Sequence, residues 1–240
     1  MSIRTRSIVK YGLPLLLLGA ISFGAYLEKP AKRPLAFVRK FKPTVGLQKL
    51  GKLKDIKKRG KPLYNGDTLQ TGKNGFALVQ FMDKSLAKVR PQSRLIVRGK
   101  VKGKQNTSTR IGLELGKIFL NVAHQGANKF EVATQTSVAT VKGTKFGASA
   151  DDYFWVERGV VEVRSNRSGK KVSLTKNHYG RVKDDGNIVT GKLNPKQIKK
   201  KEDKYSSLTE QLKPKVYKLQ FIDGNGQKRV ITIKVFKNEK

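Results

Sequence analysis

The chain of 240 residues contains no cysteine. This absence excludes disulfide bonds, thiolate nucleophiles, iron–sulfur clusters and cysteine-ligated zinc sites. Acidic residues are also scarce, because 17 Asp and Glu stand against 52 Lys and Arg and give a formal net charge of +35. Such an excess attracts polyanions, but a net charge alone specifies neither a fold nor a partner.

Residues that could perform catalysis or hold a metal are few. The two histidines, His124 and His178, do not belong to an H-E-x-x-H arrangement. Gly143-Thr144-Lys145 lacks the spacing of a phosphate loop, and Asp223-Gly-Asn-Gly226 lacks the later acidic ligands of a calcium loop. We therefore expect no enzyme, no metal, no cofactor and no small-molecule substrate. The other acidic candidates stand beside turn-forming residues, where a carboxylate usually caps backbone amides: Asp67, Asp83, Asp151 and Asp184.

The N-terminal region has the composition of a membrane-insertion signal. Residues 11–27 carry no charge and follow a basic tail, residues 1–10. As a helix this stretch would extend about 26 Å, at the low end of what crosses a hydrocarbon layer of about 30 Å. We expect a retained single-pass anchor in the bacterial inner membrane, with an uncleaved or cleaved signal peptide as the alternative. The tail would stay in the cytoplasm and the bulk of the chain in the periplasm, although the basic residues after the stretch would also fit the opposite orientation.

The remaining chain divides by composition. Residues 28–44 contain three prolines among basic residues and predict an extended linker. Residues 45–190 consist of short alternating apolar runs between turn residues, such as Ile118, Leu120 and Val122. This pattern predicts an all-β domain built as a short-stranded sandwich, a roll or a β-solenoid.

Residues 191–214 predict one basic amphipathic helix. Asn194-Pro195-Lys196-Gln197 provides an N-cap, a proline at the first helical position and a glutamine at the third. Ile198 and Tyr205 belong to a narrow apolar stripe that we expect to dock on the β domain or on a partner. The opposite face predicts either a solvated surface or contacts with anionic polymers, through Lys199, Lys200, Lys201 and Lys204.

Residues 215–240 predict a C-terminal β-hairpin that turns at Asp223–Gly226. A single hairpin is marginally stable in water, so we expect it to extend the main sheet or the edge of a partner. Four aromatic residues lie close together earlier in the chain, and we expect packing in the core or on a sheet face rather than contacts with nucleic-acid bases: Phe146, Tyr153, Phe154 and Trp155.

Several ordered motifs resemble those of FecR domains. The resemblance covers roughly residues 46–185 and is strongest at Val141-Lys-Gly143-Thr144-Lys-Phe146. Departures occur at four positions, where Lys84 and Asn177 replace glycines, Gln135 replaces a proline and Arg158 precedes a motif glycine. The motif residues that carry the resemblance are Gly66, Asp67, Thr71, Asp83, Gly116, Gly143, Thr144, Phe146 and Gly159.

The resemblance implies a periplasmic, all-β and non-enzymatic module that takes part in signalling. The best-known FecR proteins pass a signal to a sigma factor through a cytoplasmic segment. Because about ten residues precede the predicted anchor, too few for a folded unit, we do not transfer that step to this chain. We expect an envelope protein as the partner. The alternative is electrostatic binding of lipopolysaccharide, cell-wall polymer or nucleic acid.

Overall fold

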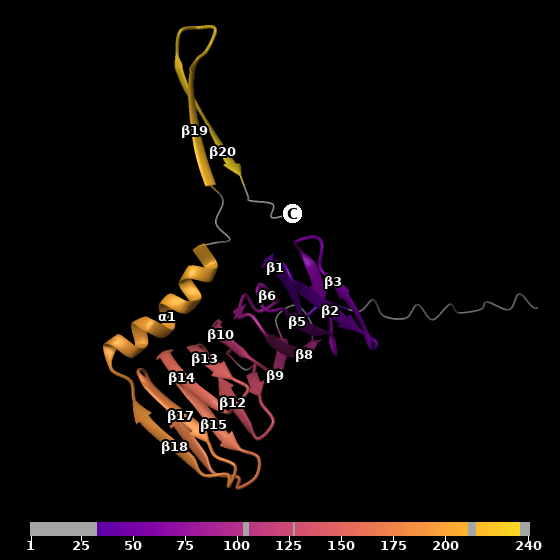
Figure 1. The fold of residues 1–240 in the computed structure, drawn as a ribbon, viewed down its shortest axis with the longest axis vertical. Helices are drawn as coiled ribbons and strands as arrows, with labels where there is room; N and C mark the ends of the chain where they lie inside the picture. Colours follow the sequence, from indigo (N-terminus) through magenta and orange to yellow (C-terminus); the bar gives the residue numbers. More distant parts are fainter. Residues whose placement is uncertain (1–32, 103–105, 127, 211–214, 236–240) are drawn as a thin grey trace, which may run out of the picture. The chain divides into compact units, whose positions relative to one another are not determined.

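The computed structural model describes residues 33–102, 106–126, 128–210 and 215–235 (Figure 1). The predicted tail and anchor, residues 1–27, lie outside the described residues. Within the described ranges no helix is long and apolar enough to cross a membrane. The described chain is mostly β-strand, which confirms the all-β prediction.

Eighteen of the strands form two sheets of nine strands each. In spatial order the first sheet contains β18 (Ile188–Lys192), β17 (His178–Val182), β14 (Tyr153–Arg158), β13 (Lys145–Ser149), β10 (Lys117–Asn121), β7 (Leu86–Val89), β6 (Phe76–Phe81), β1 (Ala36–Lys42) and β4 (Lys61–Leu63). The second contains β16 (Lys171–Leu174), β15 (Val161–Ser165), β12 (Ser137–Val141), β11 (Phe130–Ala133), β9 (Asn106–Leu115), β8 (Ser93–Lys102), β5 (Thr68–Thr71), β2 (Val45–Lys49) and β3 (Lys52–Asp55).

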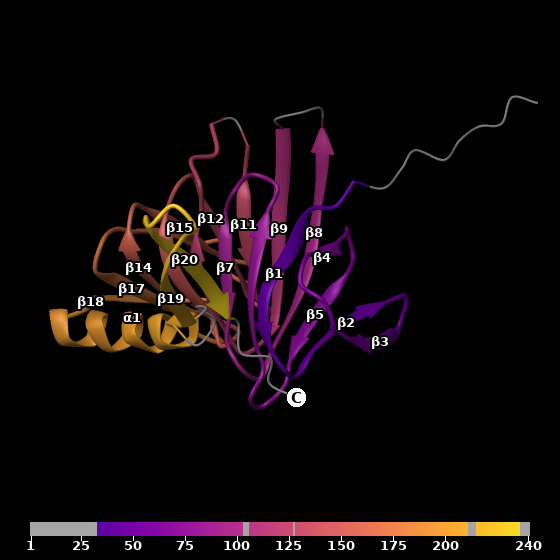
Figure 2. The same cartoon turned by 90° about the horizontal axis from the view of Figure 1, so that it is seen from above.

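The chain passes back and forth between the two sheets as it advances along them (Figures 1 and 2). It forms the hairpin β6–β7 in the first sheet and then β8–β9 in the second. After β10 in the first sheet, it forms β11–β12 in the second sheet and β13–β14 in the first. Among the described ladders, β9–β11 is parallel and the others are antiparallel. The architecture therefore combines a sandwich of two sheets with the one-directional advance of a solenoid.

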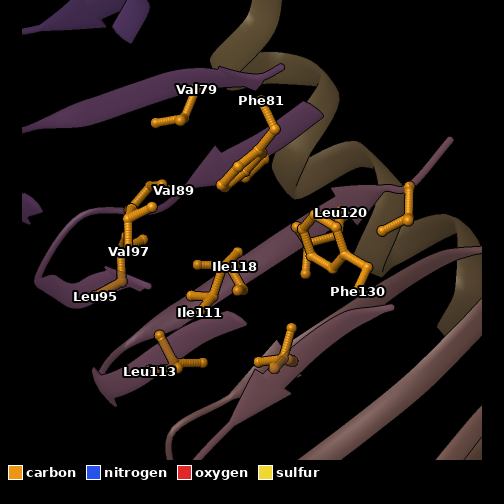
Figure 3. Close-up of a cluster of buried hydrophobic side chains, with 14 of the residues drawn as sticks. Val79, Phe81, Val89, Leu95, Val97, Ile111, Leu113, Ile118, Leu120 and Phe130 are labelled. Atoms are coloured by element: carbon orange, nitrogen blue, oxygen red, sulfur yellow. The ribbon is translucent and has the colours of Figure 1, made fainter. Parts of the chain in front are cut away.

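The apolar core lies between the two sheets (Figure 3). Ile118 and Leu120 of β10 have an exposed fraction of 0%, because alternate residues of a strand point to the same face. Phe81 of β6 and Phe130 of β11 meet edge to face across the core, with ring centroids 5.3 Å apart. Side chains from six strands interleave in this region, namely β6, β7 and β10 of the first sheet and β8, β9 and β11 of the second.

The structure corrects the part of the expected linker that it describes, residues 33–44. Strand β1 pairs with β4 and β6, and Leu35, Ala36 and Val38 are buried in the core. The linker prediction is wrong for this segment because its basic residues, such as Arg39, share the strand with side chains that face the core. The β body therefore begins before residue 45.

Helix α1 (Pro195–Glu210) begins as its sequence predicts. The backbone N of Gln197 donates to Oδ1 of Asn194 at 2.8 Å, and the backbone N of Asn194 donates to Oε1 of Gln197 at 3.0 Å. This reciprocal pair is a capping box. The helix packs Tyr205 against Phe119 and Trp155 on the outer face of the first sheet, so docking on the β body is confirmed. The last residues of the predicted helical segment, 211–214, lie outside the described residues.

Strands β19 (Lys215–Ile222) and β20 (Lys228–Val235) form the predicted C-terminal hairpin. Oδ1 of Asp223 accepts hydrogen bonds from the backbone N of Asn225 at 3.0 Å and of Gln227 at 2.9 Å, which fixes the turn. In the described residues the hairpin is a separate two-stranded sheet. The expectation that it extends the main sheet is therefore wrong for this structure, and extension of a partner's edge stays a prediction.

Candidate interaction surfaces

The motif glycines lie at tight corners of the β body. Gly116 connects β9 to β10 with φ = +81°, and a methyl group there would overlap Oγ of Ser93 and lie 2.5 Å from the carbonyl oxygen of Gln92. No other residue type fits this corner without moving the backbone. The other three motif glycines also have positive φ, at +89° for Gly66, +137° for Gly143 and +91° for Gly159.

The motif aspartates bind backbone and side-chain groups of turns. Oδ2 of Asp67 accepts a hydrogen bond from the backbone N of Tyr64 at 2.9 Å. Oδ1 of Asp83 accepts one from the backbone N of Ser85 at 2.9 Å, and its Oδ2 accepts one from Nε2 of Gln125 at 2.7 Å. Both carboxylates therefore have the structural role that their place beside turns predicts.

The remaining motif residues are internal. Oγ1 of Thr71 donates to the carbonyl oxygen of Arg90 at 2.6 Å, and Oγ1 of Thr144 donates to that of Val160 at 2.9 Å. Phe146 is fully buried in the core. These three side chains are bonded or packed inside the β body, where they hold the fold together.

Two departures from the family motif lie at positions that favour glycine. Lys84 has φ = +70° and Asn177 has φ = +66°. A residue with a Cβ atom is strained in this left-handed region, although asparagine tolerates it better than lysine. Both turns therefore have a backbone that glycine adopts without strain, and the strain falls on Lys84 and Asn177.

A buried carboxylate that the sequence did not identify joins the two sheets. Oδ1 of Asp152 accepts hydrogen bonds from the hydroxyls of Thr134 and Ser137, and its Oδ2 accepts one from Oγ1 of Thr136 at 2.7 Å. Asp152 precedes β14 of the first sheet, whereas Ser137 begins β12 of the second. The Asp151-Asp152 turn was recognisable in the sequence, but nothing there indicated which hydroxyls would approach it.

The histidines do not form a site. His124 is exposed, and Nδ1 of the partly buried His178 lies 3.0 Å from Oγ1 of Thr175 in its own turn. Within the described residues no group of three or more His, Asp or Glu side chains is placed to hold a metal ion.

The four lysines predicted as polyanion contacts divide between two environments. Lys199 and Lys200 are exposed on α1. Lys201 is partly buried, and its Nζ lies 4.5 Å from the ring centroid of Tyr153. Lys201 and Lys204 line a cavity of about 230 Å³ between α1 and the first sheet. Burial, helped by the charges of Lys117 and Lys204, lowers the pKa of Lys201.

The hairpin exposes apolar side chains on both faces, with Leu219, Phe221 and Ile231 on one and Ile222 and Val230 on the other. Leu219 pairs with Ile231 and Phe221 pairs with Arg229, and residues opposite each other in an antiparallel pair share a face. The exposed fractions are 54% for Leu219, 44% for Phe221 and 49% for Ile231. We call these three residues the hairpin apolar face. Clusters of this kind commonly mark contact sites when several exposed apolar groups are contiguous.

Residues 67–162 match the family model described as FecR protein. The resemblance to FecR domains is confirmed. The FecR-matching segment includes Asp67 and the glycines at 116, 143 and 159, but it is shorter than the range that the motifs suggested and leaves out α1 and the hairpin.

Two crystal structures of a candidate anti-sigma factor from Parabacteroides distasonis, at 1.65 Å and 2.50 Å resolution, are similar to the chain. Each has 18% sequence identity and a TM-score of 0.47, and the match covers 55% of this chain. The chain matches only 62% of the length of those proteins. No curated protein matches the sequence.

Proposed function

We propose that the chain is a sensor or interaction module of the bacterial envelope, which binds a protein partner and performs no catalysis. Residues 11–27 would anchor it in the inner membrane by a single pass, with the bulk of the chain in the periplasm. The match of residues 67–162 to the FecR family supports a signalling role in the envelope. The hairpin apolar face is the observation that carries the proposal, because it offers a surface for a partner.

The hairpin suits recognition by strand addition. In the described residues β19 and β20 pair only with each other, so each leaves an outer edge of backbone amide and carbonyl groups. A partner strand could hydrogen-bond to such an edge while apolar side chains cover Leu219, Phe221 and Ile231. Arg229 pairs with Phe221 on this face and is exposed, while Lys218 and Lys228 are exposed on the opposite face, so the surroundings favour a partner with acidic residues near its contact strand.

A photo-cross-linking amino acid at two neighbouring positions of the full chain tests the proposal in cells. Residue 221 belongs to the hairpin apolar face, whereas residue 220 points to the opposite face. We expect position 221 to give one discrete protein adduct and position 220 to give several-fold less of it. Leu219→Glu in the same chain should remove the adduct. Equal yields from the two positions, or adducts only with cytoplasmic proteins, would contradict the proposal.

The second candidate function is electrostatic binding of envelope polyanions or nucleic acid, which the net charge of +35 favours. Ionic strength separates the two candidates. Binding to a polyanion weakens steeply as salt rises, because it depends on the release of counterions. A protein interface with an apolar centre should persist at high salt. If the complex formed in cells dissociates fully at moderate salt, the polyanion candidate replaces the first.

A further inference from the structure

The cavity beneath α1 gathers positive charge from four separate elements. It has a volume of about 230 Å³, which exceeds the roughly 30 Å³ that one water occupies in the liquid and leaves room for a small molecule. The surrounding cations come from the end of β7, from β10, from β17 and from α1. They are Arg90, Lys117, Arg181, Lys201 and Lys204.

The one carboxylate of the cavity is already neutralised by a neighbour. Oδ2 of Asp151 lies 3.0 Å from Nη2 of Arg181, and Ser149 donates a hydrogen bond to its Oδ1. Burial raises the pKa of Asp151, but Ser149 and Arg181 outweigh it and hold that pKa below its usual value. Among the described residues no carboxylate pairs with the other four cations of the cavity, Arg90, Lys117, Lys201 and Lys204.

Aromatic rings hold two of these cations in place. Nζ of Lys201 lies over the rings of both Tyr153 and Trp155, at 4.5 and 5.6 Å from their centroids. The guanidinium of Arg90 lies 5.6 Å from the ring centroid of Tyr205. Such contacts attract the cation and restrict its side chain. The charges are therefore positioned at a wall of the cavity before any ligand arrives, which lowers the entropy lost on binding.

We propose that this cavity binds the phosphate group of a small phosphate monoester. A phosphate monoester carries a charge of about −1.5 to −2 at neutral pH, which suits several converging cations better than a single carboxylate does. Arg90 can donate two parallel hydrogen bonds to it, and Lys117, Lys201 and Lys204 can act as point charges. Asp151 and Ser149 offer acceptors for hydroxyl groups of the esterified part. This inference does not depend on the protein partner proposed above.

Calorimetric titration of the full chain in detergent tests this proposal, at constant ionic strength and with glucose 1-phosphate, inorganic phosphate and glucose. We expect both phosphates to bind and glucose not to bind. Lys201→Gln should weaken phosphate binding about tenfold, in line with the loss of about 1.4 kcal/mol from one charged contact. Lys199→Gln is the matched control, because it removes the same charge from the exposed face of the same helix and should change the affinity less than about twofold.

Lys117→Gln provides a second test of the cavity in case Lys201→Gln does not fold. Its side chain is exposed on β10 and lines the cavity, so the variant should keep the fold and still lose phosphate affinity. Equal weakening by Lys199→Gln and Lys201→Gln would show diffuse electrostatics and overturn the proposal. So would the absence of phosphate binding at millimolar concentration in the wild-type chain.

Two further arms identify the source of the phosphate group. Vesicles of phosphatidylcholine with phosphatidic acid present the monoester on a lipid headgroup, whereas glucose 1-phosphate presents it in solution. Lys201-dependent binding to either the vesicles or glucose 1-phosphate supports the cavity as the binding site. The one that binds more tightly identifies the source of the phosphate group. Vesicle binding that Lys201→Gln and Lys199→Gln reduce equally would count against the cavity.

Discussion

Strands β10 and β19 both place apolar side chains at alternate positions along one face, yet the surroundings of these faces differ. In β10, Ile118 and Leu120 face the core with an exposed fraction of 0%, and Phe119 is covered by α1. In β19, Leu219 and Phe221 remain about half exposed. The FecR-matching segment thus uses its apolar residues to hold two sheets together. The hairpin keeps a comparable set outside any core, where it is available for recognition and adds little to the stability of the body.

The largest effect should come from Gly116→Ala in the β body. The added methyl group would overlap Ser93 and approach the carbonyl oxygen of Gln92 in a left-handed backbone, so we expect a loss of roughly 3 kcal/mol or more. Urea unfolding followed by the fluorescence of Trp155 measures it. The matched control is Gly226→Ala in the hairpin turn, where φ is +74° and nothing lies within 4 Å of the new atom. A similar loss of body stability in the control would break the comparison.

A smaller effect should appear at alkaline pH beneath α1. Burial raises the pKa of Tyr205 to about 12, while Arg90 lowers it less. Because the folded-state pKa exceeds the usual value of 10.0, the protonated phenol stabilises the folded state below pH 10, and this contribution is lost between pH 10 and about 12. We expect the unfolding free energy of the wild type to fall relative to Tyr205→Phe over that window. Parallel pH curves for the two proteins would show that Tyr205 is not buried.

A gain of about 0.5–1 kcal/mol should follow Lys84→Gly, because glycine relieves a side chain held at φ = +70°. Chemical unfolding of the two proteins measures the change. Lys73→Gly is the control, since Lys73 is exposed in a turn but has no positive φ, so glycine there should lower stability. If both variants are less stable than the wild type, the backbone at Lys84 is not strained. The expected contrast between Lys84 and Lys73 would then fail.

The smallest effect on stability should come from Leu219→Gln in the hairpin apolar face. An exposed substitution of this kind usually changes the unfolding free energy by less than about 0.5 kcal/mol. The same change should clearly reduce the adduct formed from position 221 in cells. A loss of several kcal/mol would mean that the hairpin packs on the body, and the contrast with β10 would then fail.

The sequence predicted those elements whose signals are local. The capping box at Asn194 and Gln197, the turn at Asp223 and the alternation around Ile118 depend on residues a few positions apart, and each is confirmed. Strand β1 was missed because its basic residues dominate the local composition, while the strands that bury it lie farther along the chain.

The candidate sites depend on contacts that no local pattern reports. Lys199 and Lys201 were equivalent in the sequence, yet only Lys201 lies over Tyr153 and Trp155, since the docking of α1 decides which side of the helix meets the sheet. The hydroxyl groups around Asp152 come from residues 15 to 18 positions earlier in the chain. The apolar hairpin was visible in the sequence, but its separation from the larger sheets was not.

The back-and-forth path between the two sheets has a consequence for how the chain folds. Most strands of the two larger sheets pair with strands near them in chain order, and no described ladder joins the β4 end of the first sheet to its β18 end. Local pairing of this kind lowers the entropy of loop closure and favours faster folding than in sandwiches with distant partners. Structure can then grow hairpin by hairpin from one end. A destabilising substitution in β18 would therefore unfold that end of the sheet first and leave the β4 end assembled.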